Sequence, residues 1–150
     1  MSARIDDRTG LQSLEQDECF RLLAAAPLGR LAVVVGTQPL IFPVNFALDG
    51  RAVVIRTATG TKLASARGAP VAFECDGIDA TYHTGWSVLV IADAEEVLDP
   101  LEIERIERLP VRPWSSLSET TWLRLRPKSV SGRRIPPPGR TNQEEESTCR

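Results

Sequence analysis

Residues 51–67, RAVVIRTATGTKLASAR, constrain the fold most because they pass from strand to loop to helix within a short span. The β-branched run at 53–55 predicts a buried strand, and the small polar residues that follow predict a loop. Thr61 is placed to cap a helix over 61–67. Backbone N–H groups and a helix N-terminus would then lie beside Arg56 and Lys62, which favours a phosphate monoester. An ordinary hairpin exit with solvated basic residues is the alternative.

The length, composition and net charge of the chain limit the class of protein to which it can belong and the partners it can bind. Its 150 residues suit one domain, and a net charge of −2 with a pI of about 5.5 gives no general case for binding nucleic acid. No apolar run approaches the ~18 residues of a membrane helix, and the N-terminus has no apolar secretory segment, so a cytoplasmic location is expected. Cys19, Cys75 and Cys149 are odd in number and widely spaced, which predicts neither a disulfide framework nor a metal site.

Most of the expected elements are strands joined by short turns. Ser13 and Gln16 form a capping-box pattern before a helical apolar stripe, which predicts a helix over 14–26. Asp49 and Gly50 form a two-residue hairpin signal, and Pro43 indicates an edge strand or a bulge. Strands are expected at 29–35, 40–48, 52–57, 71–76, 86–98 and 121–127, and a further helix at 100–108. Whether the last strand continues into 128–135 after a kink is left open.

These elements predict a mainly β fold with flanking helices. Six strands with hairpin links and no repeated βαβ unit indicate an antiparallel sheet closed into a small barrel. The domain is expected to span 13–135. Residues 1–12 are expected to be flexible, and the proline-rich and charged residues 136–150 are expected to be a disordered tail.

Five segments in this order resemble the FMN-binding split-barrel family, which includes pyridoxamine 5′-phosphate oxidase and small flavoproteins similar to nitroimidazole-resistance proteins. The segments are PLGRLAVVV, PVNFALDG, VVIRTATGTKLAS, GWSVLVIADAEEV, and the region from PW at 113–114 to WLRLRPKSVSGRRI. The resemblance covers about residues 12–135. It implies a six-stranded antiparallel split β-barrel that binds FMN between the two subunits of a homodimer.

Carried over position by position, the resemblance implies three groups of cofactor-binding residues. The cradle residues, expected at the FMN phosphate, are Arg56, Thr57 and Lys62, with loop contacts from Thr59, Gly60 and Thr61. The ring residues, expected along the flavin ring, are Pro43, Val44 and Asn45. The distal residues are Trp86 and Ser87, expected near the ring or the ribityl chain, and Trp114 and Arg133, expected to reach the partner's flavin.

Several of these residues have a simpler alternative role. Asn45 has an amide that can both donate to and accept from a flavin, but it could also satisfy a bulge beside Pro43. Trp86 could be a core residue, and Trp114 could pack only in a loop or a dimer contact. His83, the single histidine, is expected to have a surface or structural role, with lining of a substrate mouth as the alternative.

The resemblance implies an oxidoreductase that moves hydride or electrons between a reduced nicotinamide and a small planar acceptor. A flavin would carry the redox chemistry, which agrees with a sequence that has no catalytic triad or paired carboxylates. A deazaflavin-dependent reductase and a non-catalytic flavin-binding or redox-sensing module are the alternatives. Oxidation of pyridoxamine phosphate is not expected, because the substrate-binding C-terminal extension of the longer oxidase is not found in this sequence.

Overall fold

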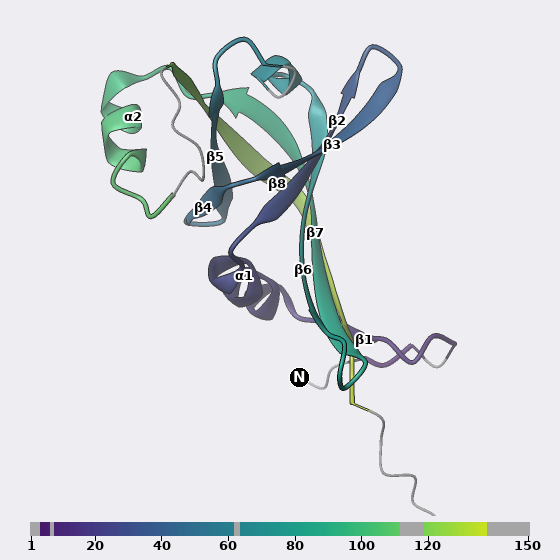
Figure 1. The fold of residues 1–150 in the computed structure, drawn as a ribbon. Helices are drawn as coiled ribbons and strands as arrows, with labels where there is room; N and C mark the ends of the chain where they lie inside the picture. The colour runs from purple at the N-terminus through teal and green to yellow at the C-terminus, as the bar shows by residue number, and fades with distance from the viewer. Residues whose placement is uncertain (1–3, 7, 62–63, 112–118, 138–150) are drawn as a thin grey trace, which may run out of the picture.

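An antiparallel sheet makes up most of the fold, seen in a computed structural model that describes residues 4–6, 8–61, 64–111 and 119–137 (Figure 1). The expectation of a mainly β protein is confirmed. The elements are β1 (Gln12–Leu14), α1 (Gln16–Ala25), β2 (Gly29–Val35), β3 (Gln38–Val44), β4 (Phe46–Asp49), β5 (Ala52–Ala58), the 3-10 turn η1 (Ala64–Ala66), β6 (Pro70–Asp79), β7 (Thr84–Glu96), α2 (Pro100–Ile106) and β8 (Thr120–Ile135).

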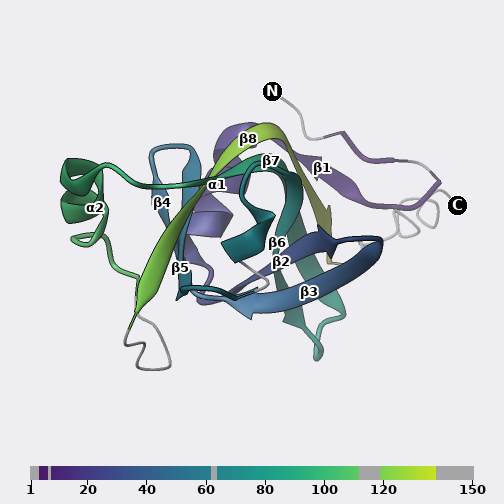
Figure 2. The same cartoon turned by 90° about the horizontal axis from the view of Figure 1, so that it is seen from above.

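The sheet is curled but open. Its strand order is β3-β2-β6-β7-β8-β5-β4, with β1 paired to β8 beside this path (Figure 2). β3 and β4 form the two ends of the path, and no ladder joins them in the described part of the chain. Only Asn45 separates these two strands, which is too short a link for a hairpin turn. The expected closed barrel is therefore corrected to an open, split one.

The described residues form eight strands in place of the six that the sequence predicts. The segment expected as one strand at 40–48 divides at Asn45, and β1 is an additional strand. Ser13 was expected in a capping box, but it lies in β1 opposite Arg133 of β8. The N-cap of α1 is instead Glu15, which makes no side-chain cap hydrogen bond. Pairing with β8 thus outweighs the local capping signal.

Further along the chain, the sequence predicts the helices and the last strand with mixed success. Within the expected helix over 61–67, the described residues form only the short turn η1. The expected helix over 100–108 is confirmed as α2, with the Asp99 carboxylate accepting a hydrogen bond from the Leu101 N–H at 3.0 Å. The last strand, β8, extends to Ile135. The extension into 128–135, which the sequence left open, is therefore present.

β8 contains a bulge that changes which of its residues face the core. The ladder moves from Ile91 to Ala92 on β7 while β8 passes over Lys128 as an extra residue. Before the bulge, odd-numbered residues such as Leu125 are buried, whereas after it the even-numbered Gly132 is buried. In a strand, alternate residues face opposite sides, so the extra residue lets β8 present apolar side chains to the core along its whole length.

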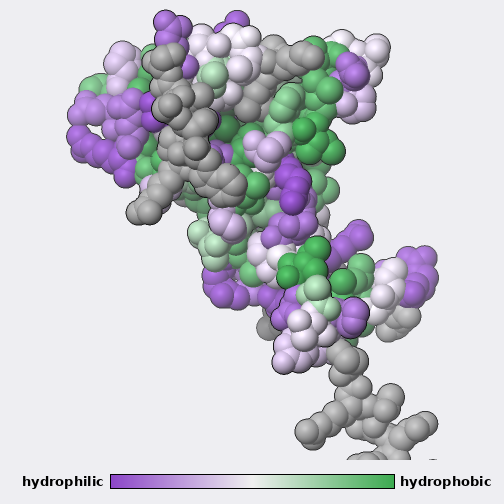
Figure 3. All heavy atoms as spheres, viewed as in Figure 1, coloured by the Kyte–Doolittle hydropathy of each residue, from purple (hydrophilic) through white to green (hydrophobic). Residues whose placement is uncertain are grey.

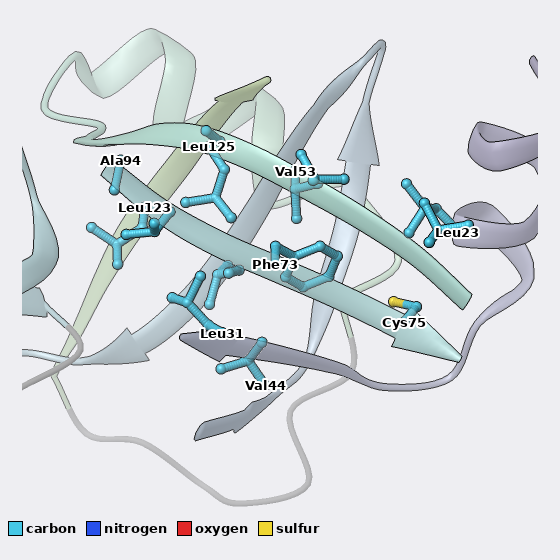
Figure 4. Packing of buried hydrophobic residues seen from close by; sticks show 14 of the residues in the cluster. Leu23, Leu31, Val44, Val53, Phe73, Cys75, Ala94, Leu123 and Leu125 are labelled. Atoms are coloured by element: carbon cyan, nitrogen blue, oxygen red, sulfur yellow. The ribbon is translucent and has the colours of Figure 1, made fainter. Parts of the chain in front are cut away.

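The main hydrophobic core lies on the side of the sheet that faces α1, which we call the inner face. The cluster of buried residues joins Leu23 of α1 with residues of six strands, including Phe73 of β6 and Leu125 of β8 (Figure 4). The Phe46 ring meets Phe73 edge to face, with 4.9 Å between centroids. Each large apolar side chain buried here contributes about 1.5–3 kcal/mol relative to exposure.

A second, smaller core lies on the opposite, outer face of the sheet. α2 covers this face only where β4, β5 and β8 meet, at the left of Figure 1. Ile106 of α2 is fully buried and packs with Val54 and Trp122 of the sheet. The rest of the outer face has no helix on it among the described residues.

Ion pairs attach α2 to the sheet. The Arg105 guanidinium donates to both carboxylate oxygens of Asp49 at 2.8 and 2.7 Å. Glu102 accepts hydrogen bonds from Arg105 at 2.9 Å and from Arg124 of β8 at 2.7 Å. The hydrogen bonds from Arg105 and then Arg124 lower the pKa of Glu102 to about 2, and Arg105 also lowers the pKa of Asp49.

No described helix is long and apolar enough to cross a membrane. Among the described residues, no cluster of three or more His, Cys, Asp or Glu side chains could hold a metal ion.

The lowered pKa of Glu102 predicts a pH-dependent stability. The contribution of its carboxylate is present above the unfolded-state pKa of about 4.3 and is lost as the pH falls towards the folded-state value of about 2. We therefore expect Glu102→Gln to lower Tm at neutral pH, with the difference from the wild type shrinking between about pH 4.5 and about pH 2. Thermal melts followed by circular dichroism measure this.

Glu104→Gln is the matched control on the same helix, because Glu104 pairs, among the described residues, only with Arg108 in an exposed contact. Its Tm difference from the wild type should be small at every pH. A Glu102→Gln difference that stays constant down to about pH 2 would contradict the role of the network.

Candidate functional site

Threonine hydroxyls gather where β5 ends beside the start of β8. Thr57 and Thr61 lie with their hydroxyl oxygens 3.2 Å apart, and Thr59 and Thr121 lie 3.0 Å apart. The Thr61 hydroxyl donates to the Ala58 carbonyl at 2.9 Å and accepts from the Ala64 N–H at 3.3 Å, so Thr61 acts as the expected cap. These contacts give the loop a polar, internally hydrogen-bonded floor.

Gly60 allows the turn inside this loop. Its φ of +78° lies in the left-handed region, which other residues rarely adopt, and a Cβ on it would meet nothing within 4 Å. The space above the loop backbone is therefore open among the described residues.

Arg56 leaves β5 on the other side of the sheet. Consecutive strand residues point to opposite faces, so Thr57 faces the inner side and Arg56 the outer side, opposite Trp122 of β8. The Arg56 guanidinium lies 5.7 Å from the centroid of the Trp122 ring. Arg56 Nε and Trp122 Nε1 are buried, and neither has a hydrogen-bond partner among the described residues. The structure thus divides the cradle residues between two faces.

The ring residues lie at the junction of β3 and β4. Pro43 is exposed on the outer face opposite Arg30, whereas Val44 is buried in the main core. Asn45 and Phe46 line a cavity of about 440 Å³. Its other walls are formed by the end of α1, by β4 and by Pro110.

The distal residues Trp86, Ser87 and Arg133 surround the tip of the β6–β7 hairpin. Two hollows of about 900 and 750 Å³ adjoin this tip. The Trp86 ring packs against β6 at Gly77, where an added Cβ would lie 2.5 Å from the indole nitrogen. Ser87 and Arg133 are paired in register across β7 and β8.

His83 lies at the tip of the same hairpin. Its φ of +52° lies in the left-handed region, and among the described residues no other non-glycine residue has a positive φ. His83 lines both hollows near Trp86. This position is compatible with the alternative role, in which His83 lines a substrate mouth.

The cradle and distal residues stand far apart within one chain. Arg56 is opposite Trp122, and Trp86 is opposite Arg134, which is twelve residues further along β8. At ~3.3 Å per residue, this separation is roughly 35–40 Å along the strand. The two groups cannot contact one small molecule in a single copy of the chain.

Other predicted and missed residues complete the site description. Lys62 and Trp114 lie outside the described residues. Thr121 and Trp122 were not singled out from the sequence, because their proximity to the loop depends on the register between β5 and β8. Burial raises the pKa of the Cys75 thiol to about 12, so this group is not a ready nucleophile.

Comparisons with known proteins place this geometry in a family. A family model described as pyridoxamine 5′-phosphate oxidase matches residues 15–134. The uncharacterized protein Rv0080 of Mycobacterium tuberculosis is 38% identical over 135 residues, which cover 85% of this chain and 88% of that protein.

Two solved structures share the fold. The FAD binding protein from Mycobacterium smegmatis matches with a TM-score of 0.73 and 38% identity, covering 83% of this chain and 99% of its own. A FAD-binding protein from Mesorhizobium loti matches with a TM-score of 0.69 and 24% identity, covering 83% of this chain and 96% of its own, and at that identity shows the fold alone. The chain therefore belongs to the pyridoxamine 5′-phosphate oxidase-like family of flavin-binding split barrels.

Proposed function

We propose that this chain is a homodimeric oxidoreductase that binds a flavin through the loop after β5. The observation that carries the proposal is the group of threonine hydroxyls around the open, left-handed Gly60. FMN is the first candidate cofactor, because it ends in the phosphate monoester that such a loop suits. FAD is the second, because the Mycobacterium smegmatis relative is described as a FAD binding protein.

The residues at the end of β5 fit the phosphorylated end of a flavin. To donate to phosphate oxygens, the hydroxyls of Thr57 and Thr61 would exchange their present bonds, to the Thr61 hydroxyl and to the Ala58 carbonyl, for bonds to the ligand. The space over Gly60 leaves room for a ligand to approach the backbone. The buried Arg56 Nε–H lacks a partner among the described residues, and buried donors normally have one. This donor suits an anion. The Arg56 side chain, however, extends from the outer face of the sheet, whereas Thr57 faces the inner side.

A bound flavin would supply the hydride and electron transfer. The chain's part is to bind and orient it. Arg56, Thr57, Thr61 and Lys62 would hold the phosphate, and Asn45 would orient the ring because its amide both donates and accepts. The apolar side chains next to Asn45, including Val44 and Phe46, would exclude water from that region.

A dimer follows if one flavin uses both the cradle and the distal residues. The separation of roughly 35–40 Å along β8 prevents one copy from supplying both. A second copy can supply Trp86, Ser87 and Arg133, and twofold pairing is the commonest closed assembly.

Cofactor titration tests the proposed phosphate contacts. We expect the purified protein to bind FMN or FAD, with Lys62→Met and Arg56→Met each weakening binding by about 1.5–3 kcal/mol, as for a hydrogen bond to a charged group. Quenching of flavin fluorescence measures the dissociation constant. Arg51→Met removes the same charge from an exposed site at the β4–β5 hairpin and should leave binding unchanged.

Three outcomes of this titration have distinct meanings. A protein that binds neither flavin contradicts the proposed function. Weakened binding in Thr57→Val and Thr61→Val with no change in Arg56→Met would assign the phosphate to the inner face only. Stronger binding of FAD than of FMN would select the second cofactor.

Turnover is a separate prediction. The flavin-loaded protein should oxidise NADH or NADPH faster when a planar acceptor, such as a nitroaromatic compound or free flavin, is added. Stopped-flow absorbance of the bound flavin measures its reduction and reoxidation. Tight flavin binding without reduction by either nicotinamide would instead support a non-catalytic flavin-binding module.

A further inference from the structure

The hairpin of β6 and β7 extends past α1 at one end of the sheet (Figure 1). Trp86 shares the alternation of the buried Val88 and packs against the main core, so its ring lies on the inner face, whereas Ser87 faces outward. Arg134 lines the hollow of about 900 Å³, while Ser87 and Arg133 line the one of about 750 Å³. The larger hollow, which we call the tip hollow, therefore lies on the inner side of the hairpin.

Aromatic side chains line the tip hollow. The Trp86 ring lies beside Gly77, which has no side chain, and is only partly buried. Tyr82 and His83 come from the turn at the end of the hairpin. Figure 3 shows hydrophobic and polar side chains together at the surface of this end of the molecule. A hollow of about 900 Å³ with such walls has the size and the apolar surface to take a small aromatic ring.

Hydrogen bonds inside the turn hold this wall in place. Asp79 Oδ1 accepts from the Thr81 N–H at 3.0 Å and from the Tyr82 N–H at 3.1 Å. His83 keeps its left-handed backbone in the same turn, a conformation that costs free energy for a residue other than glycine. The two N–H groups also partly compensate the charge of Asp79, which reduces its repulsion of an anionic ligand.

A cation stands beside the Trp86 ring. Arg134 is in register with Trp86 across β7 and β8. Its guanidinium donates to Glu18 of α1 at 2.9 Å, and Glu18 also pairs with Arg21. Two guanidinium groups thus share one carboxylate, which leaves a net positive charge. Among the described residues Arg134 forms no other ion pair, so further N–H groups of its guanidinium are available to an anion.

We propose that the tip hollow binds a planar aromatic acid, meaning an aromatic ring that carries a carboxylate. The ring lies against Trp86, and the carboxylate accepts hydrogen bonds from Arg134. A single available guanidinium matches a monoanionic carboxylate better than a doubly charged phosphate monoester.

This ligand site goes beyond the proposed flavin site. Ser87 and Arg133, which are expected near a flavin, face the other side of the hairpin. Arg134 was not among the residues expected to bind the cofactor, so it separates the two sites in an experiment.

Titration with 1-naphthoate and with its neutral counterpart 1-naphthylmethanol tests this assignment. The wild type should bind the acid at least about tenfold more tightly, because only the acid accepts hydrogen bonds from the charged Arg134. Arg134→Met should remove this preference, and it should fold because Glu18 keeps its pair with Arg21. Arg126→Met is the matched control, since Arg126 is also an arginine of β8 but pairs with Glu95, away from the tip hollow.

Trp86→Leu tests the stacking surface. It should weaken the binding of both compounds about fivefold, because the ring contact is lost for the acid and for the alcohol alike. Ligand-observed NMR measures the dissociation constants, and circular dichroism checks the fold of each variant. The comparison of the two compounds on the wild type does not depend on the folding of any variant.

Several outcomes would overturn the inference. These are a wild type without saturable binding of 1-naphthoate, equal affinity for the acid and the alcohol, and a preference that survives in Arg134→Met. Displacement of 1-naphthoate by FMN would assign the tip hollow to the flavin and overturn it as a separate site. If 1-naphthoate binds as expected but neither FMN nor FAD binds, the inference holds and the proposed function fails.

Discussion

The pairing of β8 with its neighbours is the constraint on which the rest of the structure depends. This strand is hydrogen-bonded to β7 along most of its length, to β5 at its start and to β1 at its end. It therefore sets the relative positions of the threonine cluster and the β6–β7 hairpin. Because a hydrogen-bonded ladder does not stretch, the two groups of site residues are held at opposite ends of the sheet.

The two faces of the sheet are covered by different elements and to different extents. The inner face is buried by the curvature of the sheet and by α1, so it supplies most of the hydrophobic stabilisation. The outer face is covered at one end only, by α2, where Arg124 and Arg105 bridge acidic residues. The outer face thus contributes to stability mainly at the end that α2 covers.

The sequence predicts the strands better than it predicts the site. The β-branched run of β2 and the hairpin signal at Asp49 and Gly50 identify local structure, because they report on burial and on left-handed φ angles. β1 was missed because a three-residue strand has no pattern apart from its partner. The division of Arg56 from Thr57 follows from strand alternation alone and could have been predicted. The separation of the distal residues could not, because it depends on long-range register.

The single extra residue at Lys128 determines which sequence changes this chain can accept. Odd-numbered residues of β8 face the core before Lys128, and even-numbered residues face it afterwards. The extra residue in the bulge makes this change possible. Exchanging Lys128 for another polar residue leaves that phase intact. Deleting it would rotate one half of the strand, turning arginines such as Arg124 inward and leucines outward. The fold therefore depends more on chain length at this position than on the identity of the side chain.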